Sequence, residues 1–304
     1  MAEIVIEHDQ EYNLALCVPT KEGYTFLGWY DANDNRIFKI EKGTINDITL
    51  YGKWERKITE GLEYELSSDK TYYTIVGIGT ATDTDIVIPS TYNSLPVKSI
   101  AYKAFYNCDN LTSVVIGDNI TTIENNAFSL SSNLTSVVIG ENVENIGFQA
   151  FELCSNLENV VMGNNVKSIG TQAFYNCPKL TSINIPSSVS NIGEQVFTYC
   201  RKLTSINVDI NNGFYKSIDG NLYTKDEKTL IHYSTGKTDS TFVVPNGVTN
   251  VKQYAFYFSD YLEKIEIPNS VVNIEQYAFL NCDKLEYIDN VNGRYLSPLL
   301  CKRD

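Results

Sequence analysis

One motif recurs along most of this chain at a fixed interval of 23 residues. Its fullest copy covers residues 169–186 and reads I-x-x-x-A-F-x-x-C-x-x-L-x-x-I-x-I-P. The phenylalanine of the motif keeps this interval in two series, which a gap of 59 residues separates: Phe105, Phe128, Phe151, Phe174 and Phe197, then Phe256 and Phe279. A fixed period of this length is typical of a solenoid, in which each coil buries its apolar face only against neighbouring coils. The sequence therefore predicts a stack of coils that one insertion interrupts.

Three columns of the repeat are predicted to form the core of this stack. Equivalent residues of successive coils in a parallel solenoid lie about 4.8 Å apart. The phenylalanine column is joined by an isoleucine and a leucine column, and we assign all three a structural role only: Ile100, Ile123, Ile146, Ile169 and Ile192; Leu111, Leu134, Leu157, Leu180 and Leu203.

The departures from the 23-residue period divide the chain. Residues 1–56 do not share it and instead have the pattern of a small module of short strands. Residues 57–70 are polar and are predicted to be a linker. The solenoid is predicted over residues 71–304, with a β-hairpin insertion at 209–241.

The bulk composition argues against two classes of partner. The 304 residues carry a net charge of −13 and contain no cluster of Lys and Arg. Nucleic acids and anionic lipid surfaces are both bound through cationic side chains. We therefore expect no nucleic acid and no membrane surface as partners. The 21 tyrosines favour recognition, because tyrosine on an exposed sheet makes a surface that is adhesive yet soluble.

The sequence has no pattern of membrane insertion or of a secretion signal. No apolar run approaches the roughly 20 residues that span a bilayer. Residues 1–10 lack the basic and the apolar stretch of a signal peptide. These residues alone leave two alternatives open: the protein is intracellular, or the chain is the mature or trimmed part of an exported protein.

Seven cysteines raise the question of a metal site or of disulfides. Five of them share one column of the repeat, which Ser131 and Ser259 occupy in other copies. Side chains of one column point in parallel, which suits disulfide geometry badly. No C-x-x-C and no adjacent His supports zinc. We predict buried free thiols in this column: Cys108, Cys154, Cys177, Cys200 and Cys282.

The other titratable residues indicate neither catalysis nor metal binding. His232 lies in the insertion and has no acidic or cysteine partner at a telling spacing. Residues 31–35 resemble the start of a calcium loop, but Arg36 and Lys42 stand where that loop requires Gly and Glu. We interpret the segment as a hairpin turn. The sequence thus predicts no catalytic residue, no metal ligand and no cofactor.

Two outward columns of the predicted sheet are the informative positions for function. The first column is mainly hydroxylic: Ser113, Ser136, Asn159, Ser182, Ser205, Lys264 and either Glu286 or Tyr287. The second is apolar over three coils, then amide-bearing, then charged: Val115, Val138, Val161, Asn184, Asn207, Glu266 and Asp289. The valines reflect either β-propensity alone or the dry centre of a partner-binding patch. The insertion offers a second candidate surface through its aromatic residues: Phe214, Tyr215, Tyr223 and Tyr233.

Two family resemblances add to this interpretation. The repeat motif, together with Y-x-S-I-D-G-x-L-Y-T in the insertion, resembles the BspA-like (treponemal-type) leucine-rich repeats over residues 70–290. Segments 22–31 and 48–55, EGYTFLGWYD and ITLYGKWE, resemble the B-repeat (Listeria-Bacteroides repeat) of internalin-like surface proteins. The first resemblance implies a right-handed solenoid with a parallel sheet on the concave face and short 3₁₀ or helical turns on the convex face. The second implies a β-grasp-like module.

The resemblances also imply a function. Members of both families are mostly bacterial surface or secreted proteins, and many bind host proteins or other cells. We therefore expect a mainly β, extracellular or surface-located adhesion protein without enzymatic activity, whose partner is a protein or glycan on a host or neighbouring cell. A passive spacer is the alternative, and a glycan-processing enzyme ranks last.

Overall fold

The computed structural model describes residues 11–14, 18–21, 24–43 and 48–290. The chain forms two compact units, Met1–Ile58 and Thr59–Asp304. Among the described residues, no helix has the length and apolar character needed to cross a bilayer.

The N-terminal unit is a small antiparallel β structure. Its described strands form a three-stranded sheet in the order β3-β2-β5 and a separate pair of β1 with β4. Their bounds are β1 Tyr12–Asn13, β2 Tyr24–Tyr30, β3 Arg36–Ile37, β4 Lys39–Ile40 and β5 Tyr51–Arg56. Leu14, Trp29 and Ile40 are buried at its centre. Asp31 Oδ1 accepts hydrogen bonds from the backbone N–H of Asn33 and Asn35, so segment 31–35 forms a turn between β2 and β3.

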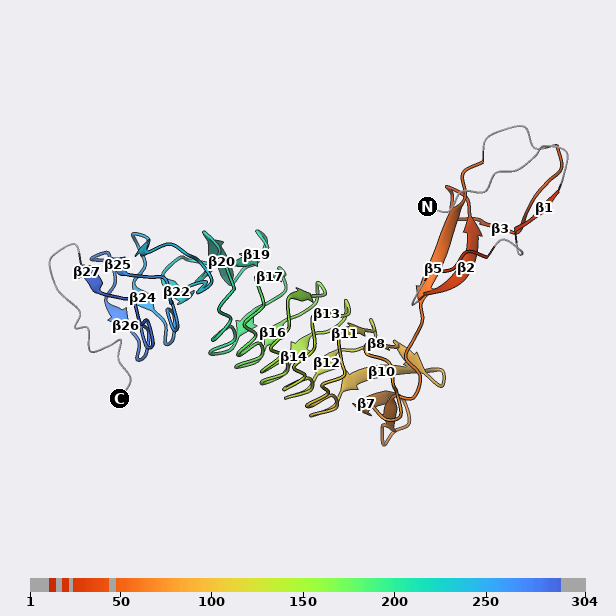
Figure 1. Cartoon of the computed structure of the whole chain (residues 1–304), viewed down its shortest axis with the longest axis horizontal. Helices are drawn as coiled ribbons and strands as arrows, with labels where there is room; N and C mark the ends of the chain where they lie inside the picture. The colour runs from red at the N-terminus through yellow and green to blue at the C-terminus, as the bar shows by residue number, and fades with distance from the viewer. Residues whose placement is uncertain (1–10, 15–17, 22–23, 44–47, 291–304) are drawn as a thin grey trace. The chain divides into compact units, whose positions relative to one another are not determined.

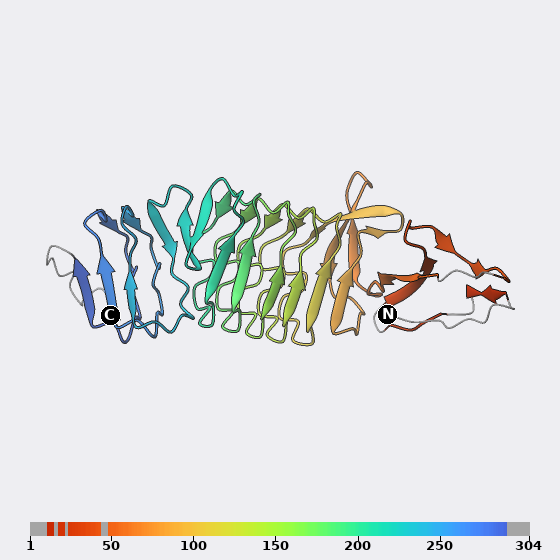
Figure 2. The same cartoon turned by 90° about the horizontal axis from the view of Figure 1, so that it is seen from above.

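The second unit is a solenoid of coils with the predicted 23-residue period, which confirms the fold class (Figure 1). One strand of each coil contributes to a sheet that we call the front sheet. Figure 2 shows these strands as a row of arrows running from orange to blue. Their bounds are β8 Asp85–Ile88, β11 Ser113–Ile116, β13 Ser136–Val138, β15 Asn159–Val161, β17 Ser182–Ile185, β19 Ser205–Val208, β23 Thr241–Val243, β25 Lys264–Ile267 and β27 Tyr287–Asn290.

A second set of strands, which we call the back sheet, follows the isoleucine column. Most of its strands have only two residues, and successive ones pair in parallel. The turns of the convex face were expected to be short 3₁₀ or helical turns, but none of the solenoid residues that the structure describes is helical. The bounds are β6 Glu63–Leu66, β7 Tyr73–Gly77, β9 Thr91–Tyr92, β10 Leu95–Ile100, β12 Thr122–Ile123, β14 Asn145–Ile146, β16 Ser168–Ile169, β18 Asn191–Ile192, β20 Tyr215–Ile218, β21 Asn221–Thr224, β22 Thr229–His232, β24 Asn250–Val251 and β26 Asn273–Ile274.

The back sheet corrects the predicted linker at 57–70. Strand β6 lies inside this segment and pairs antiparallel with β7. The backbone N–H of Thr59 also donates a 3.0 Å hydrogen bond to Val87 O. These hydrogen bonds place the segment from Thr59 onward in the solenoid, where the β6–β7 hairpin begins the back sheet. A sequence pattern of polar residues did not indicate β6, because three of its four residues are exposed.

The phenylalanine column forms a continuous aromatic spine in the core. Rings of Phe105, Phe128, Phe151 and Phe174 stack almost parallel, with centroids 5.0–5.3 Å apart and interplanar angles of 2–3°. All four side chains are fully buried. The centroid spacing is close to the distance between neighbouring strands, so the backbone ladders set the ring stacking. Each coil therefore buries its aromatic ring against two identical neighbours.

The insertion divides the core into two clusters. One cluster runs from Leu62 to Leu222 and the other from Tyr223 to Ile288. The spine crosses this boundary through the insertion itself, because the ring of His232 lies 5.9 Å from that of Phe197 and the ring of Tyr233 lies 5.3 Å from that of Phe256. We call this boundary the seam.

The front sheet is also interrupted once before the seam, between β15 and β17. Coils approach so closely after β15 that a Cβ at Gly163 would lie 2.3 Å from the carbonyl oxygen of Gly140. Pro186 occupies the equivalent position after β17. Proline has no backbone N–H to donate at this position.

Candidate functional site

A column of valines lies on the outward side of the front sheet. Parallel pairing places Val115 opposite Val138 and Val138 opposite Val161, as the repeat spacing predicted. Val87 of β8 pairs with Val115 and extends the column to a fourth coil. Val138 and Val161 are 36% and 58% exposed, whereas the residue before each is buried. We call Val87, Val115, Val138 and Val161 the valine stripe.

Hydroxyl and amide side chains border the valine stripe. Ser113, Ser136 and Asn159 stack in register two residues before the valines of their strands. Thr112 and Ser113 each donate a 2.7 Å hydrogen bond to Asp85 Oδ1. These hydrogen bonds, first that of Ser113 and then that of Thr112, lower the pKa of Asp85. The border is thus polar, and at its N-terminal end it carries a fixed carboxylate.

The next two coils continue the same columns with amides. Ser182 pairs with Ser205, and Asn184 pairs with Asn207. Asn207 Nδ2 donates a 3.0 Å hydrogen bond to Asn184 Oδ1, while Ser205 Oγ donates to Asn207 Oδ1. Both asparagines are exposed. The register therefore brings these four predicted residues together as a short amide ladder beside the valine stripe.

In the C-terminal coils, the two outward columns carry charged side chains that form ion pairs. Lys264 Nζ lies 3.0 Å from a carboxylate oxygen of Glu266 and 3.0 Å from one of Asp289. These contacts, first that of Glu266, raise the pKa of Lys264. Tyr287, rather than Glu286, pairs with Lys264 and is 58% exposed. Exposed ion pairs of this kind are screened by water, so we expect them to contribute little to the binding of a partner.

The structure overturns the surface role predicted for three tyrosines of the insertion. Tyr223 and Tyr233 are buried, so neither is able to contact a partner. Tyr215 is half-buried, and its hydroxyl oxygen accepts a 2.9 Å hydrogen bond from the backbone N–H of Ile192. Strands β20, β21 and β22 replace a coil of the back sheet, and the three side chains pack within the solenoid.

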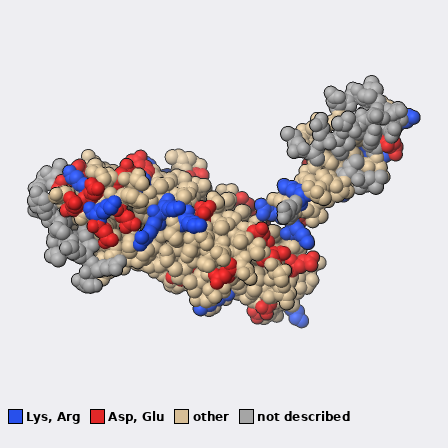
Figure 3. Space-filling view, viewed as in Figure 1, with Lys and Arg blue, Asp and Glu red and all other residues tan. Residues whose placement is uncertain are grey.

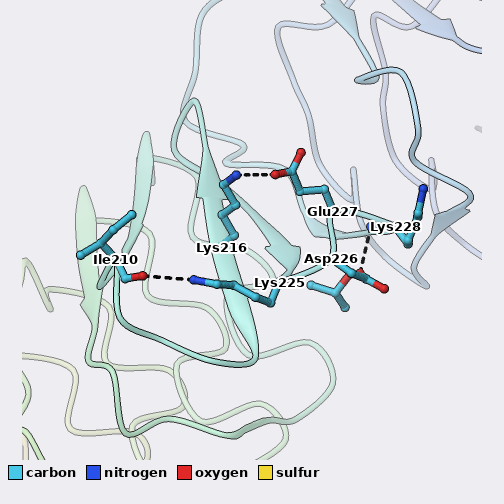
Figure 4. Close-up of polar contacts among 7 residues, drawn as sticks. Ile210, Lys216, Lys225, Asp226, Glu227 and Lys228 are labelled. Carbon is cyan, nitrogen blue, oxygen red and sulfur yellow. Dashed lines mark hydrogen bonds and ion pairs between the residues drawn. The ribbon is translucent and has the colours of Figure 1, made fainter.

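The exposed part of the insertion presents Phe214, which was among the predicted surface residues, and Ile210, which was not. Phe214 and Ile210 are 56% and 82% exposed, and they lie in the loop that directly follows β19. The lysines nearby are already engaged: Lys216 pairs with Glu227, and Lys225 Nζ donates a 3.1 Å hydrogen bond to Ile210 O (Figure 4). The loop therefore offers apolar contact beside the amide ladder, a feature that the repeat pattern does not encode.

The cysteine column is a set of hydrogen-bond donors inside the core. The thiols of Cys154, Cys177 and Cys200 each donate to the carbonyl oxygen of the phenylalanine 26 residues earlier, at 3.2–3.3 Å. Ser131 Oγ makes the same bond to Phe105 O at 2.7 Å. Burial raises the pKa of Cys154. Within the described ranges these cysteines are free, and no group of three or more His, Cys, Asp or Glu is arranged to hold a metal.

Comparison with solved structures finds the same solenoid fold in other bacterial proteins. The pneumococcal vaccine antigen PcpA is 22% identical, with a TM-score of 0.62 over 77% of this chain and 69% of that chain. A leucine-rich repeat protein of Eubacterium ventriosum is also 22% identical, with a TM-score of 0.50 over 77% of this chain and 71% of its own. A leucine rich cell surface protein of Faecalibacterium prausnitzii is 29% identical, with a TM-score of 0.46 over 77% of this chain and 76% of its own. No curated protein matches the sequence.

Family profiles match both units. The profile of the Listeria-Bacteroides repeat domain matches residues 3–53. The profile of the BspA type leucine rich repeat region matches in six copies, over residues 84–224 and 233–294. The repeat profile covers more than half of the chain, and the protein therefore belongs to the BspA-type leucine-rich repeat family.

Proposed function

We propose that this chain is a non-enzymatic recognition protein that binds a protein or glycan of a host or neighbouring cell through the valine stripe. The observation that carries the proposal is the register of the stripe, which presents one uncharged apolar column over four coils. Apolar centres with polar borders are the usual composition of the buried part of a binding interface.

The distribution of charge supports this location for the interface. Front-sheet residues beside the stripe are mainly Ser and Asn, although the whole chain has a net charge of −13. Figure 3 shows Lys, Arg, Asp and Glu side chains gathered over the insertion and the C-terminal coils on the side of the solenoid that this view presents. Removal of water from the uncharged side chains of the stripe and its border costs less than removal of water from charged ones, so a partner gains most from contact there.

The two modules support a location outside the cell. The BspA-type repeats and the Listeria-Bacteroides repeat domain both resemble modules of bacterial surface proteins. We propose display at the cell surface or secretion, with adhesion as the role. Binding rather than catalysis is also in keeping with the one histidine that the structure describes, since His232 is buried and burial lowers its pKa to about 4.

Replacement of Val138 by Asp tests the proposed interface. Labelled protein is applied to arrays of extracellular-matrix proteins and glycans, and the affinity for each saturable ligand is measured. We expect Val138→Asp to weaken binding at least about tenfold, because a carboxylate at the centre of an interface must lose its hydration. The melting temperature is expected to change little, since the side chain faces outward.

Val272→Asp is the matched control, because Val272 is 82% exposed and lies outside the front sheet. It is expected to bind as the wild type does. Equal binding by wild-type protein, Val138→Asp and Val272→Asp would show that the valine stripe is not the interface. The alternative function, a passive spacer, is favoured by the parallel hydrogen bonding between most successive coils. A spacer predicts no saturable ligand at all, and that result would contradict recognition itself.

A further inference from the structure

Each coil of the solenoid donates backbone hydrogen bonds to the next coil at the turn that carries the phenylalanine. The N–H groups of Gln172 and Phe174 donate to Glu194 O and Val196 O at 2.9 and 3.1 Å. After the seam the pattern resumes, with Phe256 N–H donating to Ala278 O at 2.8 Å. The turn therefore presents a row of N–H donors, and the carbonyl oxygens of the following coil normally accept from them.

At the seam, no following coil supplies carbonyl oxygens to this row of N–H donors. Among the described residues, no atom accepts a hydrogen bond from the backbone N–H of Gln195 or Phe197, the equivalents of Gln172 and Phe174 one coil on. Phe197 is buried and Gln195 is half-buried. More than nine in ten buried backbone N–H groups in proteins are paired, so the unpaired N–H of Phe197 indicates an acceptor that the chain itself does not supply.

A small cavity adjoins these donors. Gln195 and Phe197 line it together with Thr198, Leu222 and His232, and its volume is about 30 Å³. Such a volume holds roughly two water-sized oxygen atoms, since one requires about 10–15 Å³. A sugar ring or a peptide is therefore too large, whereas the two oxygens of a carboxylate fit.

Two buried side chains add polar atoms to the cavity. Thr198 Oγ1 and His232 Nε2 have no hydrogen-bond partner, although the two residues are only 1% and 6% exposed. The Oε1 of Gln195 already accepts a hydrogen bond from Gln172, so Gln195 offers its amide N–H groups instead. No charged residue lines the cavity. The lining is therefore rich in donors and contains no carboxylate that repels an anion.

We propose that the seam cavity binds the carboxylate group of a small organic acid, whose two oxygens replace the carbonyl oxygens of the missing coil. The backbone N–H groups of Gln195 and Phe197 and the hydroxyl of Thr198 donate to these oxygens. The site is separate from the valine stripe, and it does not depend on the proposed adhesion function.

Titration of the isotope-labelled full chain with sodium acetate tests the site. Amide signals of Gln195 and Phe197 are followed by NMR at constant ionic strength, with sodium chloride as the reference salt. We expect saturable shifts confined to the turn 193–198 and to His232. Thr198→Val, which keeps the shape of the side chain but removes its hydroxyl, is expected to weaken acetate binding about tenfold.

Ser129→Ala is the matched control, because Ser129 occupies the equivalent position in a regular coil and is also buried. It is expected to leave the acetate affinity unchanged. Shifts that stay linear in acetate, or that chloride reproduces, would mean that the cavity holds water only and would overturn the proposal. The wild-type titration decides this even if Thr198→Val fails to fold.

Discussion

Truncation of Phe151 to Ala is expected to lower the free energy of unfolding by about 3–5 kcal/mol. The ring is fully buried and stacks between Phe128 and Phe174, at centroid distances of 5.1 and 5.3 Å. Its removal leaves a cavity that the rigid ladders on both sides are unable to close. Urea unfolding, followed by circular dichroism, measures the loss.

Phe148→Ala is the control for this prediction, since Phe148 belongs to the same coil but is 41% exposed. Its truncation is expected to change the free energy of unfolding by less than about 0.5–1 kcal/mol. Similar losses for the two variants would contradict the assignment of Phe151 to a packed aromatic spine. Each coil contacts only its neighbours, so we also expect the truncation to destabilise the coils next to it most.

Acidification is expected to destabilise the solenoid through His232. Burial lowers the pKa of His232 to about 4 from its ordinary value of 6.5. The unfolded chain therefore binds this proton at a higher pH than the folded chain does. The stabilisation is complete above about pH 6.5 and is lost as the pH falls, by about 1.4 kcal/mol per pH unit and about 3 kcal/mol in all by pH 4.

The variant His232→Phe isolates this contribution from that of the carboxylates. Phe cannot be protonated, and its ring has the shape to pack against Phe197, which the imidazole contacts edge to face. We expect the stability difference between wild type and His232→Phe to grow in favour of the variant as the pH falls from 7 to 4. A difference that is constant over this range would mean that His232 is hydrated in the folded protein.

The sequence predicted the coil stack and the outward columns because both follow from periodicity. A fixed coil length places equivalent residues in register, and alternation within each strand decides which residues face outward. These two rules were sufficient to stack Val115, Val138 and Val161 in one column. Val87 was not predicted in this column, because it lies 28 residues before Val115 and thus departs from the 23-residue period.

Coil period and strand alternation did not predict which residues of the insertion are buried, because the coils on both sides of the insertion decide this. Alternation in 214–224 indicates two strands but not which side of each strand packs inward. Tyr223 was therefore expected at the surface, although it is fully buried. The two-residue strands of the back sheet are likewise too short to produce a period of two. The backbone N–H groups of Gln195 and Phe197 are unpaired because no regular coil follows them, and no local sequence pattern predicts that absence.

Photo-crosslinking from the border of the valine stripe tests most directly whether the stripe touches the partner. A photoreactive phenylalanine is placed at Asn159, which is exposed beside Val161, or at the equally accessible Val272 outside the front sheet. Each protein is irradiated with a macromolecule that binds saturably on the arrays. We predict a covalent adduct from position 159 and none from position 272. An adduct from position 272 alone, or equal adducts from both positions, would contradict the account.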